Sequence, residues 1–203
     1  MSRKKSLTTI YPRDIKVFKA LAACGHASYG QLREFVRDKR LCTYEKAGLI
    51  GRVPLNRPGD GSGDRTCYRL TTSGREFCRH ELHFSGMYKA QSVAHDMGIA
   101  DRYFSLSPEE RSTWQTESQV QDLYEQRIVK LRDQGEEELA QSLQDLLIQG
   151  EVSPPDAVYT TEAGEQVVLE IVTNNYGEAE LEEKTAFVEA VGFEADSIDF
   201  VRV

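Results

Sequence analysis

The chain lacks a long apolar stretch, and this lack excludes one broad class of protein. Its 203 residues contain no run of about 18 apolar residues, although a helix that spans a membrane needs roughly 20. The opening residues, MSRKKSLTTIYPRD, are basic but contain no apolar core of the kind that a secretory signal has. We therefore expect a cytoplasmic protein without a membrane partner.

Cysteine is also scarce, and its spacing gives no metal-binding motif. The four cysteines are Cys24, Cys42, Cys67 and Cys78. No two of them form a CxxC pair, so we expect reduced thiols that pack mainly in the core. Cys78, His80 and His83 lie close together on one predicted helix, but a fourth ligand is missing. No zinc site is expected.

Each half of the chain is poor in charge of one sign. The formal net charge is −8, but residues 1–90 carry 18 Lys and Arg against 8 Asp and Glu, whereas residues 91–203 carry 7 against 25. Such an asymmetry favours two domains with different partners. The basic half is the one suited to the phosphates of DNA.

In the basic half the pattern predicts three helices, two strands and a closing helix. The first helix begins at Pro12 and ends at Gly25, and its predicted core face consists of Ile15, Phe18, Leu21 and Ala22. Ser28 is the predicted N-cap of the second helix. The remaining predicted elements are a helix that ends at Gly48, strands at 49–55 and 66–71 around a loop at 56–65, and a helix at 71–82.

The third helix has two distinct faces. At 100° per residue, Leu41, Tyr44 and Gly48 face the core, whereas Lys39, Thr43 and Lys46 fall on the opposite side. Two cations for phosphates and a hydroxyl for a base edge suit a helix in the major groove. The predicted DNA-binding residues are Lys39, Arg40, Thr43, Lys46, Arg52, Arg57, Arg65 and Arg69. The alternative is that these cations only solvate an exposed face or a protein interface.

The stretches EKAGLIGRV and DRTCYRLTTSGREF resemble the recognition helix and the wing of a winged helix-turn-helix domain. This resemblance covers about 70 residues and implies binding of double-stranded DNA. We expect this DNA-binding domain at residues 1–86, with the arginines of its wing along the DNA backbone or minor groove.

The acidic half mixes helices with strands. Helical spacing is predicted from Val93 to Phe104, with His95 as a partly buried packing residue, and a charged helix is predicted over residues 129–150. A strand–turn–strand follows at 153–173, then a crossover helix at 177–191 and a final strand, SIDFVRV. We expect a small α/β domain at residues 87–203, so the whole chain falls in the α+β class.

The chain as a whole resembles the replication-relaxation family of plasmids and conjugative elements. The resemblance is carried by the winged helix, SVAHDMGIADRYF, TWQTESQ, PDAVY and VLEIVT. It implies a C-terminal domain of the PD-(D/E)XK nuclease type, in which Glu117, Asp156 and Glu170 match the acidic positions. These carboxylates could hold Mg²⁺ through oxygen ligands, with Asp156 and Glu170 as the candidate metal ligands.

One residue of that nuclease pattern is missing. A lysine normally follows the strand glutamate by two positions and steadies the attacking water, but Val172 stands there. Lys184 on the next helix is a candidate replacement, although a surface salt bridge would explain it as well. We therefore expect no catalysis, no metal and no cofactor, and an acidic domain that binds a protein partner or a second copy. The alternative for residues 153–173 is an ordinary hairpin without a site.

The leading hypothesis is a DNA-binding accessory or regulatory protein of a mobile genetic element, acting in replication, conjugative DNA processing or transcription. The first alternative is a Mg²⁺-dependent endonuclease of the PD-(D/E)XK type that the winged helix brings to its site. The second is a regulator of the antitoxin or phage-defence kind, since such proteins also join a winged helix to a nuclease-like domain.

Overall fold

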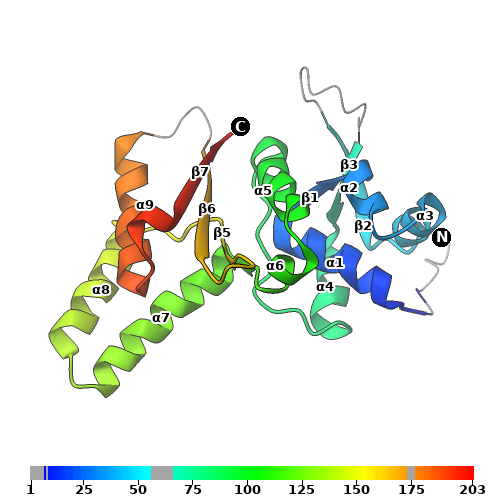
Figure 1. Ribbon diagram of the computed structural model, residues 1–203. Coiled ribbons are helices and arrows are strands. Elements are labelled where there is room, and N and C mark those ends of the chain that lie inside the picture. Colours follow the sequence, from blue (N-terminus) through cyan, green and yellow to red (C-terminus); the bar gives the residue numbers. More distant parts are fainter. Residues whose placement is uncertain (1–6, 8, 56–65, 173–176) are drawn as a thin grey trace. The chain divides into compact units, whose positions relative to one another are not determined.

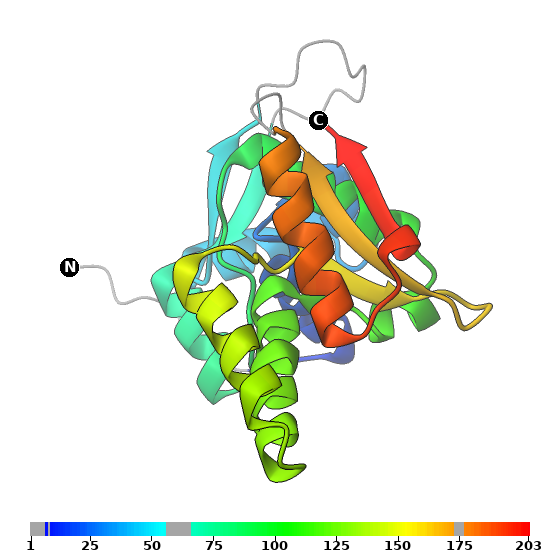
Figure 2. The same cartoon turned by 90° about the vertical axis from the view of Figure 1, so that its left-hand side faces the viewer.

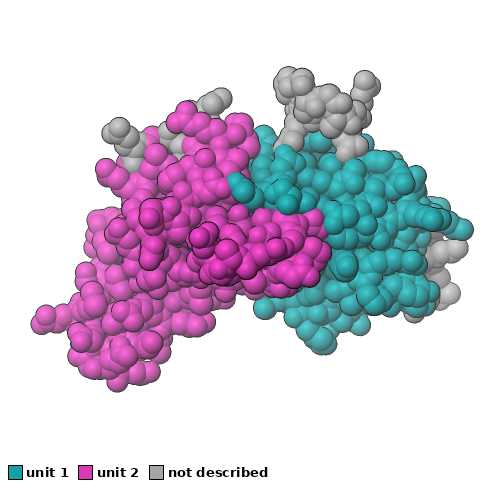
Figure 3. All heavy atoms as spheres, viewed as in Figure 1, with its two compact units in different colours: residues 1–105 teal, residues 106–203 magenta. Residues whose placement is uncertain are grey.

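The structure is a computed structural model that describes residues 7, 9–55, 66–172 and 177–203 (Figure 1). It has a mixed α+β fold and divides into two compact units, which Figure 3 colours separately: unit 1 covers Met1–Ser105 and unit 2 covers Leu106–Val203. Within the described ranges, no helix is long and apolar enough to cross a membrane.

Unit 1 combines five helices of the described chain with a small sheet. The elements are α1 (Pro12–Cys24), β1 (His26–Ser28), α2 (Tyr29–Arg33), α3 (Asp38–Lys46), β2 (Ile50–Pro54), β3 (Thr66–Leu70), α4 (Thr72–His80) and α5 (Val93–Ser105). The strands pair antiparallel in the order β1-β3-β2. The N-cap prediction is confirmed, because the Ser28 hydroxyl accepts a hydrogen bond from the Gln31 backbone N–H. The sequence did not predict β1.

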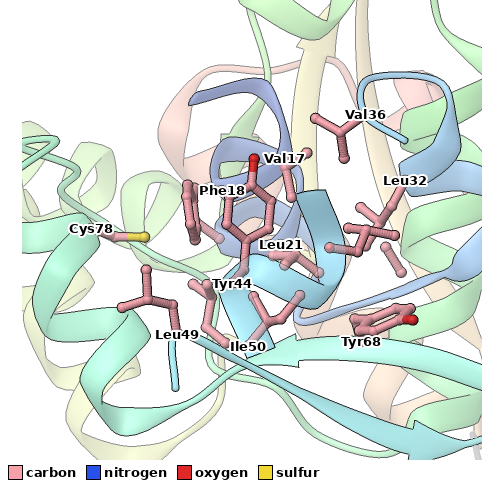
Figure 4. Packing of buried hydrophobic residues seen from close by; sticks show 14 residues of the cluster. Val17, Phe18, Leu21, Leu32, Val36, Tyr44, Leu49, Ile50, Tyr68 and Cys78 are labelled. Atoms are coloured by element: carbon pink, nitrogen blue, oxygen red, sulfur yellow. The ribbon is translucent and has the colours of Figure 1, made fainter. Parts of the chain in front are cut away.

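The core of unit 1 lies between α1, α3 and the sheet (Figure 4). The Phe18 ring is 5.0 Å from the Tyr44 ring and 5.2 Å from the Phe77 ring, measured between centroids. Leu41 and Tyr44 are buried while Lys39 and Lys46 are exposed, as predicted for the two faces of α3. Gly48, which was predicted on the core face, lies after the end of α3 and is half-buried, and Thr43 of the outer face is half-buried too.

The predicted face of α1 needs one correction. Phe18, Leu21 and Ala22 are buried as predicted, but Ile15 is 39% exposed, and the buried positions of the preceding turn are Asp14 and Val17. The inward face is therefore turned toward Asp14. Apolar spacing could not reveal this, because the residue that completes the face is charged.

The side chain of Asp14 is fully buried and joins α1 to α3. Its carboxylate accepts hydrogen bonds from the Tyr44 hydroxyl at 2.5 Å, from Arg40 Nε at 3.0 Å and from the Tyr11 backbone N–H at 2.8 Å. Arg40 Nη2 also bonds to Asp14 and donates to the Thr9 carbonyl at 2.7 Å. Burial alone would raise the pKa of Asp14, but the bonds from Arg40, Tyr44 and Tyr11 hold it below its usual value.

Helix α5 belongs to unit 1, whereas the sequence placed the domain boundary between residues 86 and 87. The helix packs against α1 and β1, and Met97, Ile99 and Ala100 are buried. The division of the structure therefore falls after Ser105. Charge counts alone could not locate it, because α5 is nearly neutral and can join either half without changing its sign.

Unit 2 is built on a four-stranded sheet in the order β4-β5-β6-β7. Its elements are α6 (Pro108–Ser112), β4 (Gln115–Thr116), α7 (Glu117–Asp133), α8 (Glu137–Gln149), β5 (Ala157–Thr160), β6 (Gln166–Val172), α9 (Glu178–Val191), η1 (Ala195–Ser197) and β7 (Ile198–Arg202). Strands β4, β5 and β6 pair antiparallel, whereas β6 and β7 are parallel. A parallel pair needs a crossover, and α9 supplies it as predicted.

Helices α7, α8 and α9 share one apolar core with the sheet. In Figure 2, α9 lies against β6 and β7, and its Phe187 and Val188 join Val158 and Val168 of the sheet in that core. The Tyr124 ring of α7 stacks on Phe187 at 4.7 Å, and its hydroxyl donates to the Leu143 carbonyl of α8 at 2.9 Å. This single tyrosine therefore connects three helices.

The expectation of one charged helix over residues 129–150 was wrong. Helix α7 ends at Asp133 and α8 begins at Glu137. Between them Gly135 adopts φ +81°, a left-handed conformation that glycine reaches without strain. The chain reverses there, and α7 and α8 pack against each other.

Replacement of Asp14 by asparagine should destabilise unit 1 by about 2–3 kcal/mol, because the partly exposed Arg40 loses its buried counter-ion. The depressed pKa of Asp14 stabilises the fold above pH 4 and ceases to do so as the pH falls through the folded-state value. Urea unfolding at pH 7 and pH 3 should therefore show a smaller difference between variant and parent at pH 3. Asp38→Ala, which removes an exposed partner of Arg33, is the control and should have a much smaller effect.

Candidate functional site

The outer face of α3 presents the first group of predicted site residues. Lys39 and Lys46 are exposed and Thr43 is half-buried. The Thr43 hydroxyl donates to the Lys39 carbonyl at 2.8 Å, so its proton is already used within the helix. While this bond is kept, the hydroxyl can act toward a base edge as an acceptor.

Two of the predicted DNA-binding arginines are already paired with carboxylates of unit 1, Arg40 with a buried one and the exposed Arg52 at the surface. Arg40 is held by Asp14, and its guanidinium lies 5.2 Å from the Tyr11 ring centroid. Arg52 makes a two-pronged bond to Glu45, with distances of 2.5 and 2.8 Å, and this carboxylate raises the pKa of Arg52. Both arginines would have to exchange a carboxylate for a phosphate in order to bind DNA.

The remaining wing arginines are only partly placed by the structure. Arg69 is exposed on β3, where it lies opposite Gly51 of β2. Arg57 and Arg65 lie outside the described residues. Lys39, Lys46 and Arg69 are therefore the predicted cations that the structure places at the surface without an ion pair to any described carboxylate.

Two of the predicted carboxylates of unit 2, those of Asp156 and Glu170, are linked by exchanged hydrogen bonds between β6 and the residue just before β5. Asp156, just before β5, accepts a hydrogen bond at Oδ2 from the Ile171 backbone N–H at 2.8 Å. Glu170 on β6 accepts one at Oε2 from the Asp156 backbone N–H at 3.1 Å. Antiparallel pairing of β5 with β6 produces this exchange, since Ala157 lies opposite Leu169. Glu117 lies next to them, because its backbone N–H donates to the Asp156 carbonyl at 3.0 Å.

Lys184 completes this cluster from α9. Its Nζ lies 3.1 Å from Glu170 Oε1 and donates to the Pro154 carbonyl at 2.6 Å. Lys184 is only 8% exposed, Asp156 3% and Glu170 0%. The interpretation of Lys184 as part of a surface salt bridge was therefore wrong, because the ion pair is buried.

Asp156, Glu170 and Lys184 are buried, whereas Glu117 is half-buried. Each carboxylate oxygen named above accepts a backbone hydrogen or faces Lys184, and the apolar side chain of Val172 is buried at the end of β6. Within the described part of the chain, no group of three or more His, Cys, Asp and Glu side chains is placed to hold a metal ion. The arrangement can neutralise a buried charge, and a metal would have to displace Lys184 from Glu170.

Unit 1 contains a second buried polar cluster that sequence reasoning missed. His26 Nδ1 lies 2.7 Å from Asp96 Oδ2, and the Tyr88 hydroxyl lies 3.2 Å from His95 Nδ1 and 3.4 Å from Asp96 Oδ1. Burial alone would raise the pKa of Asp96, but its bonds with His26 and His95 hold it below the usual value. The acidic residue next to a histidine in the apolar stretch VAHDMGIA was the signal available in the sequence.

Gly25 makes room for this second cluster. It adopts φ +77°, and a Cβ at this position would come within 2.4 Å of Asp96 Oδ2. The cluster fastens α5 to β1, which is the physical reason why α5 belongs to unit 1. His95, predicted as a partly buried packing residue, is buried at 6% exposure and hydrogen-bonded.

The Glu170–Lys184 pair yields a quantitative prediction for unit 2. Glu170→Gln leaves a buried ammonium and Lys184→Met leaves a buried carboxylate, so each single change should cost about 3–5 kcal/mol. The double variant keeps the volume but has no unpaired charge, and it should be more stable than the sum of the two changes predicts by about 1–3 kcal/mol. Urea unfolding of all four proteins measures this coupling. Strictly additive losses would show that the pair does not stabilise the fold.

Comparison of the chain with family models, with curated proteins and with solved structures gives no match. The resemblance to the replication-relaxation family therefore stays a prediction. Any function has to follow from the residues of these clusters and surfaces.

Proposed function

We propose that the chain is a cytoplasmic DNA-binding protein that holds duplex DNA against the outer face of α3. The observation that carries this proposal is that α3 has two different faces. One face buries Leu41 and Tyr44, and the other contains Lys39, Thr43 and Lys46. Lysines in such positions meet phosphates, and a hydroxyl between them can meet a base edge.

The arrangement of elements around α3 supports this proposal. A helix, a short strand, two helices and two strands in a β1-β3-β2 sheet follow one another, and this order suits a winged helix-turn-helix domain with α3 as its recognition helix. The β2–β3 connection at residues 56–65, the predicted wing, contains Arg57 and Arg65.

Charge supports the same division of labour. Unit 1 carries 19 Lys and Arg against 10 Asp and Glu, whereas unit 2 carries 6 against 23. Phosphates would be attracted by unit 1 and repelled by unit 2. Unit 2 is therefore proposed to bind a protein partner or a second copy, and the family resemblance favours an accessory or regulatory role on a mobile genetic element.

Lys39→Ala with Lys46→Ala should weaken duplex binding by about 1–3 kcal/mol if one lysine reaches a base, and by less if both meet phosphates. Fluorescence anisotropy with duplexes selected from a random pool measures the change. The matched control is the double variant Arg127→Ala/Lys130→Ala, which removes the half-buried Arg127 and the exposed Lys130 of α7 in unit 2 and should leave binding unchanged. Equal losses in both variants would contradict a specific role for α3.

An endonuclease is the second candidate, and the position of Lys184 favours it. An amine 3.1 Å from Glu170 stands where a lysine moved from position 172 to the next helix would act on an attacking water. Against this candidate, the amine already pairs with Glu170 and donates a hydrogen bond to the Pro154 carbonyl in a buried cluster. The PD-(D/E)XK character of unit 2 is therefore proposed as a scaffold without catalysis.

The purified protein should not cut plasmid DNA or its selected duplex in the presence of Mg²⁺ or Mn²⁺, because Glu170 and Lys184 neutralise each other. Gel analysis of supercoiled plasmid measures cutting over time. Cleavage that needs the metal and is lost in both Glu170→Gln and Asp156→Asn would establish the endonuclease instead. Retention of the fold in these variants has to be checked by circular dichroism.

A further inference from the structure

We infer that a hollow beside α3 is a binding site for a phosphate group. The inference rests on the proposed function, because a duplex held against α3 would supply the phosphate. The hollow has a volume of about 720 Å³ and lies within unit 1. Sites for small ligands have volumes of this order. Its walls come from the start of α1, the end of α2, the connection at residues 34–37 and the helix α3.

The lining of the hollow is strongly cationic. Among the described residues that line it are five cations, Arg13, Arg33, Arg37, Lys39 and Arg40, and one acidic residue, Glu34. Cations gathered around a concave surface raise the local concentration of anions. Guanidinium groups in particular match the oxygens of a phosphate with two parallel hydrogen bonds.

The five cations differ in how far they are already engaged. Arg40 is held by the buried Asp14, and Arg33 is paired with the exposed Asp38 at 2.5 Å. Arg13, Arg37 and Lys39 make no ion pair with any described residue. Arg13 and Arg37 are also exposed, so these two arginines are the side chains best suited to close on an incoming phosphate.

The start of α3 contributes to the same hollow. Arg37 is the N-cap residue of this nine-residue helix and lines the hollow. The first turn of the helix also contains Asp38, whose carboxylate pairs with Arg33. Lys39 and Thr43 line the hollow and also belong to the outer face of α3, so DNA on that face would lie next to it.

The ligand chemistry is that of a phosphate ester, and it has two possible sources. One is a phosphodiester of the DNA backbone, and the other is a free nucleotide or inorganic phosphate. The Tyr11 ring at the edge of the hollow lies 5.0 Å from the Arg13 guanidinium. A backbone phosphate fits the position beside α3 better, because the same two residues of α3 line both surfaces.

The test uses a double variant, Arg13→Ala/Arg37→Ala, called the arginine variant. Its control is a second double variant with the same loss of charge, Lys16→Ala/Lys19→Ala. The control lysines are exposed on α1 and do not line the hollow. Binding of a 20-base-pair duplex to the full chain is measured by fluorescence anisotropy at several salt concentrations. In parallel, calorimetry measures the binding of inorganic phosphate and of a nucleoside monophosphate.

The arginine variant should lower the magnitude of the slope of log K against log[salt] by about 1–2, since each phosphate contact contributes roughly 0.9, and the control should keep the parental slope. Equal slopes in parent and arginine variant, or equal losses in variant and control, would overturn the inference while leaving DNA binding intact. If the parent ignores DNA but binds phosphate or nucleotide through Arg13 and Arg37, the hollow is the site and the proposed function fails. If it binds none of these ligands, both fail.

Discussion

Unit 1 depends on the satisfaction of one buried negative charge. A carboxylate without solvent exposure, such as that of Asp14, is very costly unless it is paired and hydrogen-bonded. Two of its partners, Arg40 and Tyr44, lie one helical turn apart on α3. Because both must reach the same carboxylate, the rotation of α3 about its own axis is fixed. The side that then faces solvent contains Lys39, Thr43 and Lys46, so an ion pair in the core determines which residues of α3 are available for the proposed contact with DNA.

Unit 2 also contains a buried carboxylate paired with a cation, but this pair does not orient a surface helix. Glu170 is as deeply buried as Asp14, and its counter-ion Lys184 arrives from the crossover helix α9. Here the pairing turns inward and joins α9 to β6. Residues that resemble the parts of a nuclease centre are thereby used to hold the unit together. A buried amine that neutralises a carboxylate is poorly available to steady an attacking water, which is why the proposed function assigns DNA binding to unit 1 and no catalysis to unit 2.

The sequence predicted those features that repeat along the chain. Helical spacing placed Leu41 and Tyr44 inward, and the hydrophobic alternation of SIDFVRV predicted β7. Short elements escaped this reasoning, since β1 has three residues and β4 only two, too few for a period to appear. Both strands are determined by the partners with which they pair, and such partners are not visible in local sequence.

Buried polar residues were the other feature that the sequence reasoning missed, although the apolar stretch around Asp96 contained a signal for one of them. Asp14, His26 and Asp96 look like surface residues by type, and only tertiary contacts show that they are buried. Lys184 illustrates the same point from the opposite direction. Its neighbours Glu182 and Glu183 suggested a surface salt bridge, whereas its partner is Glu170, fourteen residues earlier on a different element. Ion pairs between residues that are distant in the sequence therefore explain most of the buried polar positions that the sequence did not predict.

The central claim, that duplex DNA binds on α3, is tested most directly by nuclear magnetic resonance of the full-length chain. Backbone amide signals would be followed while a selected duplex is added. The account predicts saturable shifts concentrated in residues 37–46 and around Arg13, with the amides of α7, α8 and β6 unchanged. Shifts confined to residues 106–203, or no shifts at a duplex concentration well above that of the protein, would contradict it.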